Sequence, residues 1–274
     1  MFDYGLGASI TGLTEELSLS DIDVLGKCRI STFELNPRNF TRDYDRSIRG
    51  RFKTMLQKTA KRAVSYHVPF AAYDDISAVE EDIRQMAVSR LRVSLADAVY
   101  FNCELLVVHP STEPISLNPE RRQAHIRQLR KSMAELEQDL IANNLTMALE
   151  NLPRSCMGNT LDEIRAMLED TDPAIFSVCL DVNHVMERYR ELPDMIMSLK
   201  DRLKTLHISD YDGVDERHWA PGTGVINWQE VLQALDAIDY RGPFNYELAQ
   251  KPLEEQILIL ENNFEMMQKI NRGG

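Results

Sequence analysis

The chain has 274 residues, 43% of them hydrophobic, and a formal net charge of −12 at pH 7. This composition is typical of a globular protein with a full core, and no apolar run reaches the length of about 18 residues that a membrane span needs. The acidic balance argues against a partner bound through its phosphates, because such binding needs clustered Lys and Arg. The N-terminus lacks the basic flank and apolar block of a signal peptide, so we expect a cytoplasmic protein.

Eight short apolar segments rich in β-branched residues predict strands. In chain order they are Phe2–Ser9, Arg29–Asn36, Val64–His67, Leu105–His109, Thr146–Glu150, Phe176–Asp181, Leu203–Ile208 and Pro243–Glu247. Segments with helical periodicity follow them: Leu17–Lys27, Tyr44–Ala63, Ser77–Phe101, Pro119–Asn143, Thr160–Glu169, Pro193–Lys200, Trp228–Ile238 and Leu253–Ile270. We expect Ser20 or Asp21 near the start of the first helix, and a capping box between Thr160 and Glu163.

Continuous apolar strands that alternate with helices belong to parallel sheets covered on both faces. Eight such units close most economically into a (β/α)8 TIM barrel, a fold whose active site lies at the C-terminal ends of the strands. The chain shows no linker, low-complexity tract or repeat that would divide it. We therefore expect residues 1–274 to form a single domain.

Six of the predicted strands end in a metal-ligand type of residue: His67, His109, Glu150, Asp181, His207 and Glu247. The last four end consecutive strands, so a barrel brings them around one axis. Three converging carboxylates repel one another unless a cation lies between them. Carboxylates with one imidazole suit Mn²⁺, Mg²⁺, Co²⁺ or Zn²⁺. Any one of these residues alone would be a helix cap or salt-bridge partner, but the group of four indicates a metal site.

The strand-end motifs resemble those of the xylose isomerase-like TIM barrels: Leu149–Asn151, Leu180–His184, Leu206–Asp210 and Tyr246–Glu247. The loop Glu216–Trp228, with its Pro-Gly-Thr-Gly-Val-Ile-Asn-Trp sequence, is similar to the signature of the sugar phosphate isomerase/epimerase branch. The resemblance covers essentially the whole chain. It points to the superfamily more sharply than to any one substrate.

The resemblance implies an isomerase or epimerase of a sugar or related polyol-ketone, with one divalent ion, Mn²⁺ in first place, held by Glu150, Asp181, His207 and Glu247. In the ketose epimerases of this family the two glutamates also move protons, one on each side of a metal-stabilised cis-enediolate. His184 and Arg217 match residues that hold substrate oxygens. The expected partner is a small sugar, with no nucleic acid and no membrane; assembly into a homo-oligomer stays open.

Two further groups resemble the zinc ligands of endonuclease IV, a nuclease on the same fold: His67, His109 and Glu150, and then His184, Glu216 and His218, with Glu where that family uses Asp. A multi-zinc phosphodiesterase is therefore a rival hypothesis. The negative charge and the glycine-rich loop favour the isomerase, in which His67 and His109 would bind substrate.

A lyase or dehydratase needs only a leaving group beta to the carbonyl, so it also stays open. A barrel without catalysis is the third alternative.

Several other residues receive weaker predictions. Glu34 and Asn36, at the exit of the second strand, are expected either to contact substrate or to cap a turn. Trp228 is expected to pack against the barrel rather than wall a sugar pocket. The basic run Arg42–Arg62 is expected to be a solvated helix face.

Overall fold

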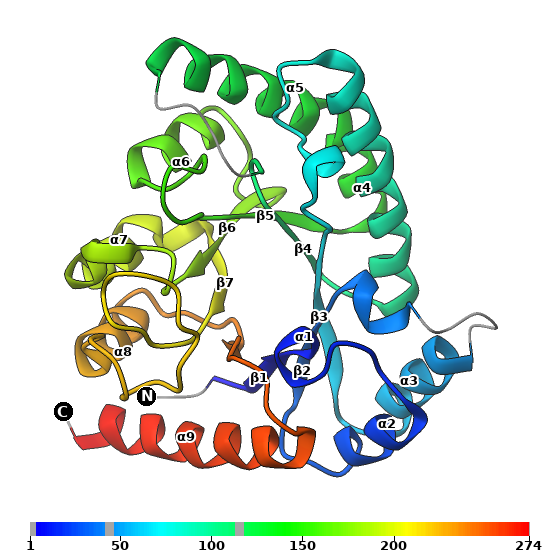
Figure 1. Cartoon of the computed structure of the whole chain (residues 1–274), viewed down its shortest axis with the longest axis vertical. Helices are drawn as coiled ribbons and strands as arrows, with labels where there is room; N and C mark the ends of the chain where they lie inside the picture. Colours follow the sequence, from blue (N-terminus) through cyan, green and yellow to red (C-terminus); the bar gives the residue numbers. More distant parts are fainter. Residues whose placement is uncertain (1–3, 42–46, 113–117, 274) are drawn as a thin grey trace.

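The computed structural model describes residues 4–41, 47–112 and 118–273. Within them, an 8-stranded parallel sheet has the order β7-β6-β5-β4-β3-β2-β1-β8. A parallel bridge between Ile208 and Tyr246 joins the two ends of this row. The sheet therefore curls into a nearly closed barrel with helices around it (Figure 1). The predicted (β/α)8 barrel is confirmed.

The strands are short and almost wholly buried, as a sheet covered on both faces requires. They are β1 (Leu6–Ser9), β2 (Thr32–Leu35), β3 (Arg62–His67), β4 (Leu105–Val108), β5 (Thr146–Glu150), β6 (Phe176–Asp181), β7 (Leu203–His207) and β8 (Phe244–Tyr246). β5 and β6 have the predicted bounds at both ends. The first strand begins at Leu6 rather than Phe2, and Phe2 itself lies outside the described residues.

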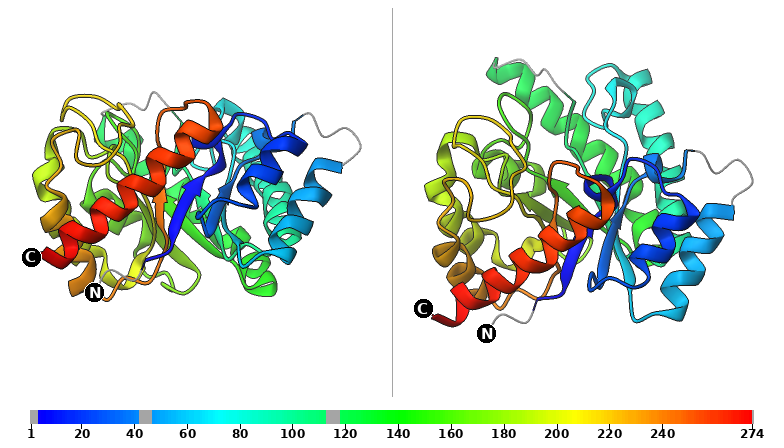
Figure 2. Two further views of the ribbon diagram at one scale, coloured as in Figure 1. Left: turned by 90° about the horizontal axis from the view of Figure 1, so that it is seen from below. Right: turned by 60° about the horizontal axis from the view of Figure 1, so that its bottom comes forward.

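The described helices are α1 (Ile10–Leu13), α2 (Leu19–Leu25), α3 (Ser47–Lys58), α4 (Glu81–Phe101), α5 (Pro119–Asn143), α6 (Leu161–Leu168), α7 (Leu192–Leu199), α8 (Trp228–Ala237) and α9 (Leu253–Gly273). The C-terminal helix α9 runs along the outside of the barrel, next to α8 (Figure 2). The sequence did not predict α1, because four residues are too few for a periodic signal. In the described part of the chain, no helix combines the length and the apolarity needed to cross a bilayer.

Capping explains two differences from the predicted helix starts. α2 begins at Leu19 instead of Leu17, with Ser20 and Asp21 near its start as expected, because Ser18 caps it through a reciprocal capping box with Asp21. Thr160 caps α6 as expected by accepting from Glu163 N. However, the Glu163 carboxylate accepts from Gly158 N at 2.8 Å instead of reaching back to the cap, so only half of the predicted box forms.

The basic run is less solvated than expected. Residues 42–46 lie outside the described part of the chain. The predicted helix Tyr44–Ala63 is seen as α3 and is wrong at its C-terminal end, because α3 ends at Lys58 and Ala63 belongs to β3. Arg49 pairs with Asp97, its side chain is only 20% exposed, and its guanidinium lies 5.4 Å from the centroid of Phe40. An arginine held by both a carboxylate and an aromatic face is part of the helix packing. The expectation of a wholly solvated face is therefore wrong at Arg49.

The inner face of the barrel carries a layer of compact side chains below the strand ends. Val107, Ala148 and Cys179 form a small buried cluster, separate from the main core between strands and helices. Each of the three lies two residues before a strand-end His, Asp or Glu, and so on the same face of its strand. Small residues in this layer leave room above them for the longer polar side chains of the site.

Candidate active site

The four predicted metal ligands converge at the C-terminal end of the barrel. Glu150, Asp181 and His207 are the last residues of β5, β6 and β7, and Glu247 follows β8. Each offers one ligand atom, and these atoms all lie within 4.8 Å of one another. His207 Nδ1 is 3.0 Å from Glu150 Oε1 and 3.1 Å from Glu247 Oε2. Parallel strands bring these residues together because their carboxyl ends share one rim.

The charges of this cluster suit a divalent cation. Burial alone would raise the pKa of the Glu150 carboxyl, but His207 and His109 outweigh burial and hold it well below its usual range. Burial would also raise the pKa of Glu247, but the nearby His207 outweighs burial and lowers this pKa to about 2. One oxygen of Asp181, Oδ2, is buried without a hydrogen-bond partner among the described residues. Carboxylate oxygens, one of them unpartnered, around an imidazole nitrogen form a fitting ligand set.

A second cluster shares Glu150 with the first. His67 and His109 each place Nε2 3.1 Å from Glu150 Oε2, and the three residues also offer ligand atoms within 4.8 Å of one another. The His109 ring stacks on Phe70, with centroids 4.3 Å apart. Glu150 thus lies between two groups of potential ligands, with one oxygen turned toward each.

Three histidines of the site are oriented in the same way. Nδ1 of His67, His184 and His218 lies 2.9 to 3.1 Å from a backbone carbonyl oxygen, those of Val68, Asn151 and Glu247 respectively. A ring that donates its Nδ1–H to a carbonyl presents Nε2 to the opposite side. In all three rings Nε2 therefore faces carboxylates. Backbone anchoring of this kind is common for histidines that bind metals or substrates.

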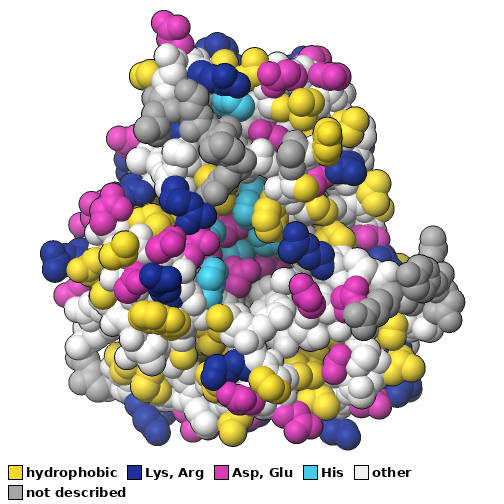
Figure 3. Space-filling model, viewed as in Figure 1, with side chains coloured by type: hydrophobic (Ala, Val, Ile, Leu, Met, Phe, Trp, Pro, Cys, Tyr) yellow, Lys and Arg dark blue, Asp and Glu magenta, His cyan; other side chains and the backbone are white. Residues whose placement is uncertain are grey.

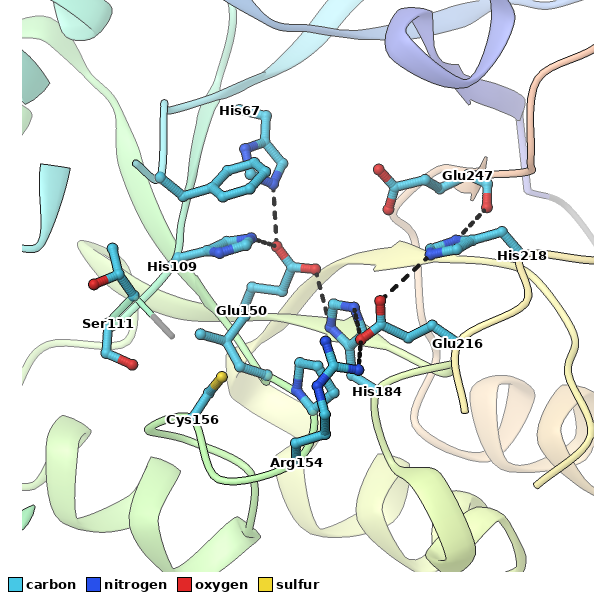
Figure 4. A pocket seen from close by; sticks show the side chains of 14 residues that line it. His67, His109, Ser111, Glu150, Arg154, Cys156, His184, Glu216, His218 and Glu247 are labelled. Atoms are coloured by element: carbon cyan, nitrogen blue, oxygen red, sulfur yellow. Dashed lines mark hydrogen bonds and ion pairs between the residues drawn. The ribbon is translucent and has the colours of Figure 1, made fainter. Parts of the chain in front are cut away.

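The third predicted triad is looser than the other two. Glu216 lies between His184 and His218 (Figure 4), with oxygens 3.9 Å and 4.0 Å from their Nε2 atoms. Within the described ranges, these three residues do not form a group whose ligand atoms are all within 4.8 Å. Glu216 instead accepts from the Arg154 guanidinium at 2.9 Å. The arrangement is a mixed-charge network on the cavity wall.

The cluster opens into a cavity of about 430 Å³, a volume in the range of small-molecule sites. Histidine and acidic side chains gather in this hollow at the centre of the barrel face (Figure 3). The sequence predicted many of its lining residues and missed several others: Phe70, Ser111, Thr112, Leu152, Pro153, Arg154 and Cys156. These follow β3, β4 and β5, and position after a barrel strand was the signal that could have found them.

Arg217 lies differently from its predicted place. Its Nε donates to Asp212 at 2.8 Å, its side chain is 44% exposed, and it is not among the described residues that line the cavity. Arg154 lines the cavity instead, from the loop after β5. Asp212 lies within the same loop as Arg217, so a local ion pair holds the predicted residue away from the cavity. The assignment of Arg217 to substrate stays a prediction.

The two polar residues at the end of β2 have different surroundings. The Asn36 side chain accepts from Arg38 N and so caps a short 3-10 helix, Pro37–Phe40, as one alternative expected. Glu34 is 1% exposed and does not line the cavity, because its side chain points into the barrel beneath the metal ligands. A direct contact between Glu34 and substrate is therefore wrong for this structure.

The loop between β7 and α8 is held by one buried carboxylate. Asp210 accepts from Gly222 N at 2.8 Å and from Trp228 Nε1 at 3.0 Å. Trp228 is 3% exposed and packs in the core, as predicted. A side chain at Gly224 would collide with the backbone of Tyr211. These contacts explain the glycine-rich sequence and fix the loop that carries Glu216 and His218.

We expect His218 to titrate near pH 9 in the metal-free protein. Burial lowers its pKa, but the nearby acidic groups Glu216, Asp181 and Glu247 together outweigh burial and raise it to about 9. Because this lies above the unfolded value of about 6.5, the protonated ring stabilises the fold below that pH, and the contribution disappears as the pH rises through 9. Histidine-ring NMR titration measures this directly. In Glu216→Gln the midpoint should fall below 9, since Asp181 and Glu247 remain; an unchanged midpoint would exclude Glu216 as a cause.

Eight parallel strands with a His/Asp/Glu cluster at their C-terminal ends define a (β/α)8 barrel whose mouth carries side chains that could hold a metal ion. A family model described as "Xylose isomerase-like TIM barrel" matches residues 27–270. The chain belongs to this family, as its sequence motifs predicted.

Individual relatives have low sequence identity to this chain, but they align with almost all of its length. The uncharacterized protein MJ1188 of Methanocaldococcus jannaschii is 24% identical over 95% of this chain and 94% of its own length. The crystal structure of a D-tagatose 3-epimerase-like protein superposes with a TM-score of 0.82 at 19% identity, covering 97% of this chain and 98% of that one. The IOLI protein, solved with a bound zinc atom, has a TM-score of 0.78 at 15% identity over 95% and 96%. At these identities the two structures establish the fold.

Proposed function

We propose that this chain is a divalent-metal-dependent sugar isomerase or epimerase. One observation carries the proposal. Of the four converging ligand residues, only Glu150 and Glu247 line the cavity, whereas Asp181 and His207 are fully buried beneath it. A small molecule in the cavity would therefore meet two carboxylates that are ionised at neutral pH. Two carboxylates facing one substrate are suited to removing and returning a proton.

The residues that would hold the ion are Glu150, Asp181, His207 and Glu247. When bound, a divalent ion such as Mn²⁺ or Zn²⁺ supplies positive charge that polarises a substrate carbonyl and makes the adjacent C–H acidic. One glutamate takes the proton from the carbon next to the carbonyl. The other, once protonated, gives a proton back to a neighbouring position or to the opposite face. We also propose that His184, which lines the cavity and has Nδ1 2.9 Å from the Asn151 carbonyl oxygen, contacts substrate oxygens.

The similarity to a D-tagatose 3-epimerase-like structure supports this choice of reaction class, and the zinc-bound IOLI structure supports a metal in such a barrel. The cavity, at about 430 Å³, is large enough for a monosaccharide but has walls on several sides. Phe70 at its edge offers an apolar surface against which a sugar ring can pack. These features favour a compact substrate over a polymer.

Proton exchange with solvent tests the proposal. The protein is incubated in D₂O with Mn²⁺ and a panel of ketoses, free and phosphorylated, and deuterium at the carbon beside the carbonyl is followed by NMR. We expect metal-dependent incorporation with at least one member. No incorporation with any ketose, together with cleavage of abasic DNA, would replace the proposal by the nuclease. Water loss from the same substrates would instead identify a dehydratase.

A metal-dependent phosphodiesterase is the second candidate, and the second ligand group favours it specifically. His67, His109 and Glu150 lie close enough together to hold another ion beside the first, and paired ions sharing a carboxylate are suited to phosphodiester hydrolysis. Elemental analysis separates the candidates. About one ion per chain supports the isomerase, and two or three zinc ions support the phosphodiesterase.

A further inference from the structure

A buried carboxylate below the cavity has no role in the reaction described so far. Glu34, on the inner face of β2, is 1% exposed. Ser65 on β3 donates its hydroxyl to Glu34 Oε2 at 2.8 Å. The other oxygen, Oε1, lies 2.9 Å from Nε2 of His207, which is also fully buried. Glu34 therefore contacts a predicted metal ligand from the side opposite the ligand cluster.

Glu34 Oε1 and His207 Nε2 are each a potential hydrogen-bond partner of the other. Neither atom has an aligned hydrogen bond within the described part of the chain. At 2.9 Å the two atoms are in reach, but the ring is turned so that Nε2–H does not point straight at the oxygen. Leaving a buried donor and a buried carboxylate oxygen unpaired is costly. A small rotation of the imidazole would satisfy both atoms at once.

His207 also differs from the other histidines of the site. His67, His184 and His218 have Nδ1 close to a backbone carbonyl and present Nε2 to the carboxylates. His207 is reversed, with Nδ1 toward Glu150 and Glu247 and Nε2 turned away from them. The only described group recorded within ion-pair distance of Nε2 is Glu34. The orientation of this one ring therefore depends on a side chain and not on the backbone.

We propose that Glu34 is a positioning residue for the metal centre. By accepting a hydrogen bond from Nε2–H of His207, it keeps the proton on Nε2 and leaves the lone pair of Nδ1 directed at Glu150, Asp181 and Glu247. A carboxylate in this position also makes the imidazole a stronger ligand. The inference rests on the proposed metal site, but it adds a residue that neither binds the ion nor touches substrate.

Metal affinity tests this role without reference to turnover. Zn²⁺ is titrated into the metal-free protein in competition with a chromophoric chelator. Glu34→Gln keeps the size of the side chain but removes its charge, and we expect zinc affinity to fall by about 10- to 100-fold. Asp75→Asn is the matched control, since Asp75 is also a buried carboxylate, at 6% exposure, and accepts from Ser77 N instead of facing His207. Its zinc affinity should stay within about twofold of wild type.

The histidine tautomer supplies a second readout, in the unmodified protein. Long-range ¹H–¹⁵N NMR of the zinc-loaded chain should show His207 protonated at Nε2, and in Glu34→Gln this signal should move or split. A wild-type His207 protonated at Nδ1, or unchanged affinity in Glu34→Gln, would overturn the inference. Failure of the wild type to bind zinc at all would instead remove the metal site, and the proposed function with it.

Discussion

Replacing Glu247 with Gln is expected to lower turnover by about 10²- to 10⁴-fold, the usual contribution of a positioned acid or base. The substitution keeps the size of the side chain and a ligand oxygen but removes the negative charge that accepts the proton. The Glu247 side chain is 26% exposed and lines the cavity, so the change acts at the substrate. Because Glu150, Asp181 and His207 remain, some metal should still bind. Turnover and metal content are measured on the same preparation.

The matched control is Glu254→Gln, the same substitution at an exposed position in the first turn of α9. It should leave turnover and metal content at the wild-type level. Wild-type turnover in Glu247→Gln would remove the acid/base role assigned to this residue. Complete loss of metal from that variant would reassign Glu247 to metal binding alone, since the missing turnover would then have a simpler cause.

Removing the metal is expected to abolish turnover and to lower the melting temperature. A ligand at 100 times its Kd stabilises the folded state by about 2.7 kcal/mol, and each kcal/mol shifts Tm by roughly 2–4 °C for a chain of 150–250 residues. Three carboxylates that converge within 4.8 Å regain their mutual repulsion when the ion leaves. Differential scanning fluorimetry with a chelator, and then with excess Mn²⁺ or Zn²⁺, measures the shift.

Asp181→Asn provides the comparison for this experiment. Asp181 is fully buried and its unpartnered oxygen belongs to the ligand cluster, so the variant should lose most of the Tm response to added metal. Equal melting temperatures for metal-free and metal-supplied wild type, with metal content verified by elemental analysis, would contradict a structural contribution from the ion.

The fold was largely predictable because its signals are local. β5 and β6 are apolar runs that end at Glu150 and Asp181, and the predicted bounds agree with the structure at both ends. α5 begins at Pro119 and ends at Asn143, as predicted. The errors lie where the deciding contact is a specific hydrogen bond. α2 begins after Ser18 because the Ser18 hydroxyl accepts a hydrogen bond from Asp21 N. From the sequence alone, Ser20 is an equally plausible N-cap.

The candidate site was predictable for strand ends and less so for loops. Any barrel brings Glu150, Asp181, His207 and Glu247 to one rim, so their convergence needed only the strand assignment. Arg154 and Arg217 both follow strands, and nothing in their neighbours indicates which one reaches the cavity. Arg217 stays out of the cavity because it donates a hydrogen bond to Asp212. Arg154 lies at the cavity wall, where it donates to Glu216.

The amino-acid sequence alone determined the order of strands and helices, the barrel, and the residue types at the mouth, because these depend on short-range periodicity and on the shared direction of parallel strands. Which side chains meet across the barrel is fixed by the three-dimensional packing of the strands. Glu34 on β2 and His207 on β7 are 173 positions apart in the numbering of the chain, yet 2.9 Å separates their closest atoms. Such contacts follow from the closure and tilt of the whole barrel, which no single stretch of sequence encodes.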